Sequence, residues 1–271
     1  MIIQGYATTE GTARYRDRLA RGGAALPEHF RHEQGLWLSS VGVGTSLGQW
    51  DEATDRAYAD AVTRAVELGA NVIDTAANYR FQRSERSVGE AIMNLTAAGV
   101  GREELVVCTK GGYLPFDTHP PAGQAGVREY VEETFVKPGV ITLNDIAAGS
   151  HCMTPPYLSH QLAQSLRNMG LETIDVYYVH NPETQLQVVA REEFDARLRA
   201  AFGQLERERA DGRIRFYGVA TWNGFRAKEG TSGHHSPTRS ASRGPRAPRR
   251  STGPSSSAPA TTSERTASPM S

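Results

Sequence analysis

The sequence of 271 residues lacks several features that mark specialised classes of protein. It has only two cysteines, Cys108 and Cys152, in no CxxC or CxxH arrangement, so we expect neither a disulfide framework nor a metal site. Cys108 lies in an apolar run and is expected to be a small buried thiol. No apolar run approaches the ~20 residues of a membrane span, and the N-terminus shows no signal-peptide pattern. We therefore expect a soluble cytoplasmic protein with no membrane partner.

An excess of one charge is also missing, because 30 Lys and Arg residues balance 30 Asp and Glu residues. Such a balance gives no general attraction to nucleic acid or to a membrane. The charges are unevenly distributed, however. Residues 226–271 contain seven arginines and Lys228 against Glu229 and Glu264, so this segment carries about +6 and the remainder about −6.

Residues 226–271 also lack Ile, Leu, Val, Phe, Tyr, Trp and Cys, and Met270 is their one large apolar side chain. Such a composition cannot bury enough apolar surface to offset an ordering cost of roughly 1–2 kcal/mol per residue. We expect this segment to be a disordered tail rich in Arg, Ser and Pro, consistent with the low mean hydropathy of −0.48 for the whole chain.

The rest of the chain alternates short apolar runs with segments of helical periodicity. Strands are predicted at 36–45, 71–74, 105–109, 174–179 and 214–220, and helices at 51–68, 84–95, 157–169 and 194–210. Residues 1–35 are polar with weak periodicity and are expected to form an N-terminal extension outside the core. Alternation at this spacing predicts parallel β-α units with right-handed crossovers, an α/β fold.

The stretch that organises this pattern is 71–91, NVIDTAANYRFQRSERSVGEA. Its β-branched residues predict a buried strand that ends at Asp74, and Tyr79 follows in the loop, so both side chains can turn into one pocket. Ser84 or Ser87 is expected to cap the next helix. Two further polar residues, Lys110 and His180, end the third and fourth predicted strands.

Two architectures fit parallel β-α units: an open doubly wound sheet and a closed eight-stranded barrel ringed by helices. No GxGxxG follows the first strand, and the polar candidates stand at the carboxyl ends of several different strands. Both observations favour the barrel, whose active site is assembled from strand ends.

Six segments of the sequence resemble the aldo/keto reductases, over about residues 36–225. They are GVGT at 42–45, NVIDTAANY at 71–79, SERSVGEAI at 84–92, ELVVCTK at 104–110, LAQSLRNMGLETIDVYYVHNP at 162–182 and GRIRFYGVATWN at 212–223. The resemblance implies a (β/α)8 TIM barrel and the reduction of a small aldehyde or ketone to an alcohol with NADP or NAD as cofactor. It also implies a catalytic set of Asp74, Tyr79, Lys110 and His180.

The chemistry of hydride transfer explains this choice of residue types. The carbonyl oxygen becomes negative as hydride arrives and needs a proton, for which Tyr79 is the expected donor. Lys110 would stabilise the phenolate and Asp74 would hold the ammonium in place. His180 would either orient the substrate oxygen by a hydrogen bond or assist proton transfer.

Four residues are expected to contact the cofactor. Thr221 or Asn223 stands where related chains carry Ser-Asn for the nicotinamide carboxamide. Gly44 and Thr45 end the first predicted run, which turns on its glycines into a loop where a ligand can approach the backbone. The long Pro- and Gly-rich connection 113–156 is expected to cover the pocket and set substrate preference, through Tyr113, Phe116, His119 and Tyr130.

The resemblance stops near Phe225, so only about five of eight β/α units are expected. The domain division is an extension at 1–35, a partial barrel at 36–225 and a tail at 226–271. The absent units are where the family stacks its nicotinamide on an aromatic ring and holds the adenosine phosphates. We therefore expect impaired cofactor binding, little activity and low solubility, because unpaired strand edges favour aggregation. A reading-frame shift in the gene would explain the abrupt change.

Other interpretations use the same residues. Asp74 and Lys110 could form a plain structural ion pair, Tyr79 could be a packed loop aromatic, and His180 could be a turn residue. A non-catalytic barrel remnant could bind acidic partners through its basic tail, although the tail lacks aromatics and lysine clusters, so nucleic acid is not the expected partner. An aldolase could use Lys110 as a Schiff base.

Overall fold

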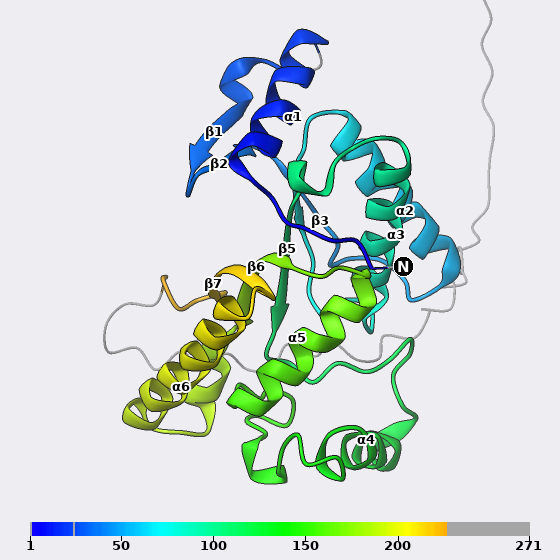
Figure 1. Ribbon diagram of the computed structural model, residues 1–271. Coiled ribbons are helices and arrows are strands. Elements are labelled where there is room, and N and C mark those ends of the chain that lie inside the picture. Colours follow the sequence, from blue (N-terminus) through cyan, green and yellow to red (C-terminus); the bar gives the residue numbers. More distant parts are fainter. Residues whose placement is uncertain (1, 24, 227–271) are drawn as a thin grey trace, which may run out of the picture. The chain divides into compact units, whose positions relative to one another are not determined.

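The computed structural model describes residues 2–23 and 25–226, which lie in one compact unit (Figure 1). The predicted disordered tail and the proposed frameshift lie outside the described residues, apart from Arg226. Within the described residues, no helix is both long and apolar enough to cross a membrane.

Five parallel strands form the central sheet, in the order in which they occur along the chain. They are β3 (Gly42–Gly44), β4 (Val72–Asp74), β5 (Val106–Gly111), β6 (Ile174–His180) and β7 (Ile214–Ala220). The pairings Ile73 with Val107 and Thr109 with Tyr177 fix their register. Each predicted parallel strand is confirmed except the first, which is shorter than expected.

Four helices follow the strands: α2 (Glu52–Glu67), α3 (Arg83–Ala97), α5 (Pro155–Met169) and α6 (Arg191–Ala210). Each packs against the next, α2 on α3, α3 on α5 and α5 on α6 (Figure 1). A doubly wound sheet carries helices on both faces and reverses its strand order. Sequential strands with one layer of helices are instead the arrangement of a β/α barrel, so the predicted α/β barrel type of fold is confirmed for these units.

Local signals in the sequence set the ends of these helices. The side chain of Asp51 accepts a hydrogen bond from the Thr54 N–H at 2.8 Å and caps α2. Pro155 and Pro156 open the first turn of α5, and Gly170 ends it in the left-handed conformation with a φ of 64°. The expected Ser84 cap is wrong, because Ser84 lies inside α3 and donates to the Thr45 carbonyl at 2.7 Å.

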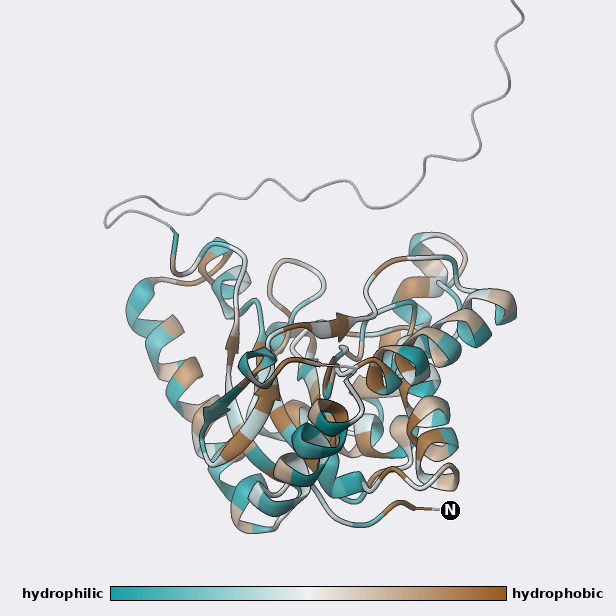
Figure 2. Cartoon of the chain, turned by 90° about the horizontal axis from the view of Figure 1, so that it is seen from above, coloured by the Kyte–Doolittle hydropathy of each residue, from teal (hydrophilic) through white to brown (hydrophobic). Residues whose placement is uncertain are grey.

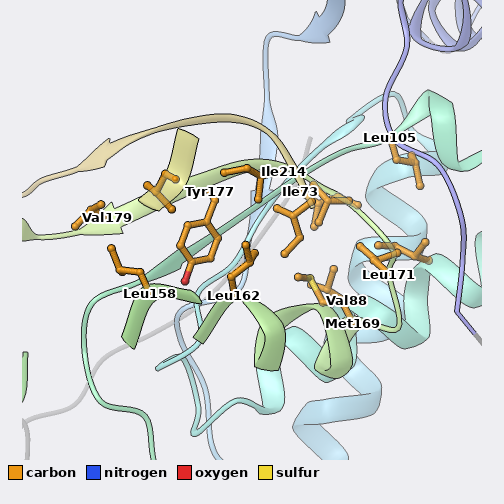
Figure 3. Close-up of a cluster of buried hydrophobic side chains, with 14 of the residues drawn as sticks. Ile73, Val88, Leu105, Leu158, Leu162, Met169, Leu171, Tyr177, Val179 and Ile214 are labelled. Atoms are coloured by element: carbon orange, nitrogen blue, oxygen red, sulfur yellow. The ribbon is translucent and has the colours of Figure 1, made fainter. Parts of the chain in front are cut away.

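The main core lies between the helices and the outer face of the sheet (Figure 3). Ile73, Tyr177 and Ile214 from the strands meet Val88 and Leu162 from the helices, all almost fully buried. In Figure 2 the helices carry hydrophobic and hydrophilic colours in alternation, as expected for helices that cover a core on one side. Tyr178, Cys108 and Phe216 project to the opposite face and form a second, smaller cluster.

The N-terminal segment differs from the expectation that residues 1–35 lie outside the core. It contains α1 (Thr9–Arg21) and a short 3-10 turn (Pro27–His29), and β1 (Phe30–Glu33) pairs in antiparallel fashion with β2 (Leu36–Ser39). Tyr15, Leu19 and Phe30 are buried in the main core. Three apolar residues among many polar ones give too weak a periodicity to be recognised in the sequence.

Two other expectations also need correction. The run 36–45 is not one strand, because it divides into β2 of the hairpin and β3 of the sheet. The connection 113–156 is not irregular throughout, since it holds α4 (Gly123–Val131), a π-helical turn (Glu132–Val136) and a 3-10 turn (Leu143–Asp145). Two further 3-10 turns are Arg102–Glu104 and Pro182–Gln187.

A buried carboxylate, Asp175 of β6, joins the N-terminal segment to the sheet. Asp175 is fully buried and accepts hydrogen bonds from Arg102 at 2.7 Å, the Val107 N–H at 2.8 Å and the Ala7 N–H at 2.7 Å. Arg102 is itself buried, so each charge depends on the other for compensation.

Asp175→Ala is expected to lower the free energy of unfolding by about 3–5 kcal/mol, because it leaves the Arg102 guanidinium buried without a counter-charge. Urea unfolding followed by circular dichroism measures this loss. The matched control is Glu67→Ala, which removes an exposed ion pair with Arg64 and should cost less than about 1 kcal/mol. Equal losses in the two variants would contradict this account.

Candidate active site

The carboxyl ends of β4, β5 and β6 bring the four predicted catalytic residues to one edge of the sheet. Asp74 is the last residue of β4 and His180 the last of β6, while Lys110 lies near the end of β5. Lys110 pairs in register with Tyr178 of β6. Since side chains alternate along a strand, Lys110 and His180 project to the same face as Cys108 and Tyr178.

The ammonium group of Lys110 is fixed by three hydrogen bonds. Its Nζ donates to Asp74 Oδ1 at 2.8 Å, to Asp74 Oδ2 at 2.7 Å and to the Thr75 carbonyl at 2.8 Å. The Lys110 side chain is 8% exposed, whereas the Asp74 side chain remains 43% exposed. An ammonium has three hydrogens, so these acceptors fix its position and orientation.

Tyr79 lies over this ammonium. The Lys110 Nζ is 5.0 Å from the centre of the Tyr79 ring, and the Tyr79 and His180 ring centres are 5.8 Å apart with their planes at 81°. The structure therefore brings together all four residues that the sequence singled out. Their catalytic roles stay predictions at this stage.

The loop after Tyr79 is held in an unusual conformation. Arg80, Phe81 and Gln82 have left-handed φ angles of 49°, 58° and 68°, which ordinary side chains rarely adopt. The buried Arg80 guanidinium donates to the Gln49 carbonyl at 2.7 Å and to Asp55 of α2 at 2.5 Å. These bonds anchor the strained turn that directs Tyr79 toward Lys110.

His180 is neutral at neutral pH. Burial is the largest cause that lowers its pKa to about 3, and the positive charge of Lys110 and the His151 ring contribute to the same shift. Within the described part of the chain, its buried Nδ1 makes no hydrogen bond. The imidazole therefore carries no charge that could act on a ligand.

A second buried histidine holds the backbone of His180. His151 Nδ1 accepts from the Gln185 side-chain amide at 2.8 Å, so its proton is on Nε2, which donates to the His180 carbonyl at 2.7 Å. Burial lowers the pKa of His151 to about 4. The Tyr113 ring packs edge-on against both His151 and His180, with ring centres 5.2 Å apart in each case.

A pocket of about 270 Å³ opens beside these residues. Two predicted catalytic residues and the turn that follows β7 provide most of its wall, which is lined by Tyr79, Lys110, Asn181, Ala220, Thr221, Trp222 and Arg226. A cavity of similar volume, about 280 Å³, lies between α1 and α2, where Tyr15, Leu19 and Val66 give it a largely apolar wall. We assign the site to the pocket beside Tyr79 and Lys110, because the charged and hydrogen-bonding groups converge there.

The predicted cofactor contacts are only partly in this pocket. Thr221 lines it, but Asn223, Gly44 and Thr45 are not among its lining residues. The Thr45 side chain is fully buried and its hydroxyl donates to Thr75 Oγ1 at 2.9 Å, so it serves the interior of the protein.

Four lining residues were not predicted from the sequence: Asn181, Ala220, Trp222 and Arg226. Asn181 is next to His180 and Trp222 is next to Thr221 in the sequence. Their position beside a predicted site residue could therefore have identified them. Arg226 could not be identified as a site residue, because it begins the segment rich in Arg, Ser and Pro that was predicted to be a disordered tail. Of the connection residues expected to cover the pocket, Tyr113 contacts His180, whereas Phe116, His119 and Tyr130 are not among the lining residues.

Both cysteines are buried and unpaired. Burial is the largest cause that raises the pKa of Cys108 to about 12, and the carboxylates of Asp74 and Asp175 contribute to this rise. Cys108 is the small buried thiol that the sequence predicted. No group of side chains among the described residues is arranged to hold a metal ion.

Comparison with known proteins agrees with the geometry. The aldo/keto reductase family model matches residues 40–229. The chain is 28% identical over 192 residues to D-threo-aldose 1-dehydrogenase of a Pseudomonas species, covering 69% of this chain and 51% of that protein. It is 29% identical over 150 residues to the NADH-specific methylglyoxal reductase of Escherichia coli K12, covering 54% of this chain and 39% of that one.

Among solved structures, the chain is similar to an aldo-keto reductase from Bacillus halodurans in its holo form. The identity is 23% and the TM-score 0.47, and the match covers 71% of this chain and 50% of that one. The chain thus spans about half the length, or less, of these relatives.

The strongly depressed pKa values of His151 and His180 make stability depend on pH. Below the ordinary value of about 6.5, an unfolded chain takes up protons at His151 and His180 that the folded chain does not. The free energy of unfolding should therefore be highest above pH 6.5 and fall by about 2–3 kcal/mol per pH unit toward pH 4.

Urea unfolding at pH 7, 6 and 5 measures this slope. His151→Gln should remove roughly half of the histidine contribution. His119→Gln is the matched control, because His119 is exposed, and it should leave the slope unchanged. A slope that His151→Gln does not alter would show that the buried histidine does not account for it.

Proposed function

Since the chain belongs to the aldo/keto reductase family, we propose that it reduces a small aldehyde or ketone to an alcohol with NADPH or NADH. The observation that carries this proposal is the Lys110 ammonium, fixed by Asp74 and the Thr75 carbonyl beneath the ring of Tyr79. The family consists of oxidoreductases. The reaction class is thus a family property, and its assignment to these four residues is our proposal.

Tyr79 is proposed to donate the proton. The carbonyl carbon gains a hydride and the carbonyl oxygen gains a proton, so the ring hydroxyl ends as a phenolate that solvent reprotonates. Lys110 stabilises that phenolate through its charge, and Asp74 keeps the ammonium in place. His180 cannot serve as a charged acid near neutral pH, because its pKa is about 3. Its proposed role is to orient the substrate oxygen by a hydrogen bond from the neutral imidazole.

The described residues fit the nicotinamide end of the cofactor. A pocket of about 270 Å³ takes a nicotinamide ring with its ribose, and Asn181 and Thr221 are among its lining residues. When bound, the reduced nicotinamide supplies the hydride. Arg226 is the one lining cation besides Lys110, so the described wall offers little for a chain of phosphates. We propose that affinity for the whole dinucleotide is weak.

The relatives support a small polar substrate. One is named an aldose dehydrogenase and another a methylglyoxal reductase, and both names denote short oxygen-rich carbonyl compounds. The substrate we propose to test first is methylglyoxal.

The aldolase alternative is less well supported by the geometry. A Schiff base requires a neutral lysine amine that is free to attack, whereas all three hydrogens of Lys110 are directed to acceptors, two of them carboxylate oxygens. Borohydride trapping of a carbonyl compound on Lys110 would favour the aldolase. The binding-module alternative depends on the tail beyond residue 226, which lies outside the described residues.

Tyr79→Phe should lower the rate of carbonyl reduction by about 10²–10⁴-fold, because it removes the proton donor. Lys110→Met should cause a loss of similar size by removing the charge that stabilises the phenolate. The measurement is the decrease in reduced-nicotinamide absorbance with methylglyoxal at saturating cofactor.

The matched control is Tyr58→Phe, which removes a tyrosine hydroxyl that donates to the Leu47 carbonyl at 2.7 Å, outside the pocket. It should retain full activity. If Tyr79→Phe is as active as Tyr58→Phe, the proposed role of Tyr79 is wrong.

A further inference from the structure

We propose that Glu183 is a positioning residue. Its carboxylate holds Thr221 so that the pocket wall presents a hydrogen-bond acceptor to the amide group of a bound nicotinamide. This inference rests on the proposed function, because it concerns the same pocket. Glu183 itself is not among the residues that line the pocket and acts through the turn that follows β7.

One oxygen of Glu183 accepts three hydrogen bonds from that turn. The Thr221 hydroxyl donates to Oε1 at 2.6 Å, the Trp222 N–H at 2.9 Å and the Asn223 N–H at 3.3 Å. Successive backbone N–H groups that converge on one anion form a concave site for negative charge. The carboxylate therefore fixes both the backbone of the turn and the rotamer of Thr221.

The hydrogen bonds that the Thr221 hydroxyl already makes determine whether it can donate to a ligand or accept from it. A hydroxyl has one donor hydrogen and two acceptor lone pairs. The donor goes to Glu183, and one lone pair accepts the Gly224 N–H at 2.7 Å. The remaining lone pair makes Thr221 an acceptor toward the pocket.

Asn181 lies on the same wall and connects it to the end of β6. Its amide nitrogen donates to the Tyr113 hydroxyl at 3.3 Å, and its Oδ1 is buried and makes no hydrogen bond within the described residues. The backbone N–H of Asn181 donates to the Ala220 carbonyl at 2.6 Å, which joins the two turns. The acceptor capacity of Thr221 matches one hydrogen of a carboxamide –NH2 group.

The first experiment compares the dissociation constants of NADP⁺ and its 3-acetylpyridine analogue, in which a methyl group replaces the –NH2. The full chain should bind NADP⁺ roughly three- to tenfold more tightly than the analogue, the worth of one neutral hydrogen bond. Glu183→Ala should abolish this preference, because Thr221 is free to turn. Glu183→Gln should keep it, because the amide oxygen still accepts. A preference that survives in Glu183→Ala would overturn the proposal.

A second measurement needs no ligand. In a Trp37→Phe, Trp50→Phe background, the one remaining tryptophan is Trp222, whose backbone Glu183 holds. Its fluorescence anisotropy should fall in Glu183→Ala and stay near the parent value in Glu183→Gln. Unchanged anisotropy in Glu183→Ala would overturn the positioning role even if cofactor binds. If the anisotropy falls in Glu183→Ala but no variant binds either dinucleotide, the positioning role of Glu183 is supported. That result would refute the proposed function and the carboxamide contact.

Discussion

The contact between the Lys110 ammonium and the Asp74 carboxylate is the interaction on which the site depends. A nearly buried ammonium is costly unless its hydrogens meet acceptors, and here both Asp74 oxygens and the Thr75 carbonyl lie within 2.8 Å. That requirement holds the end of β4 against β5. It also places one positive charge beneath the Tyr79 ring and near His180, which helps to keep His180 neutral.

The architecture explains why these groups meet. Parallel strands in sequential order, with helices on one face only, bring every carboxyl end to the same edge and leave the other face for functional side chains. Period-two alternation then puts Lys110 and His180 on the face away from the main core. Outside the sheet, two polar anchors set the remaining geometry: Arg80 holds the strained turn after Tyr79, and His151 holds the carbonyl of His180.

The sequence predicted those parts that follow from local patterns. Strand ends marked by Asp74, Lys110 and His180 could be recognised because a polar residue directly after an apolar run signals a functional edge. The core role of Tyr15 and Phe30 was missed, since isolated aromatics in a polar segment show no periodicity. Thr45 was taken for a ligand contact, although its hydroxyl serves the interior through Thr75. Glu183 and His151 could not be predicted, because their partners lie 38 and 29 residues away and only the folded chain brings them together.

The central claim is that these residues supply a proton to the oxygen of a carbonyl group whose carbon receives a hydride from the reduced nicotinamide. The most direct measurement uses purified chain, methylglyoxal and NADPH carrying deuterium at the transferable position of the nicotinamide, with the alcohol product analysed by mass spectrometry. Our account predicts a single deuterium on the carbon that bore the oxygen, and none above background with the Asp74→Asn, Lys110→Met double variant. An unlabelled product, or equal labelling by the double variant, would contradict it.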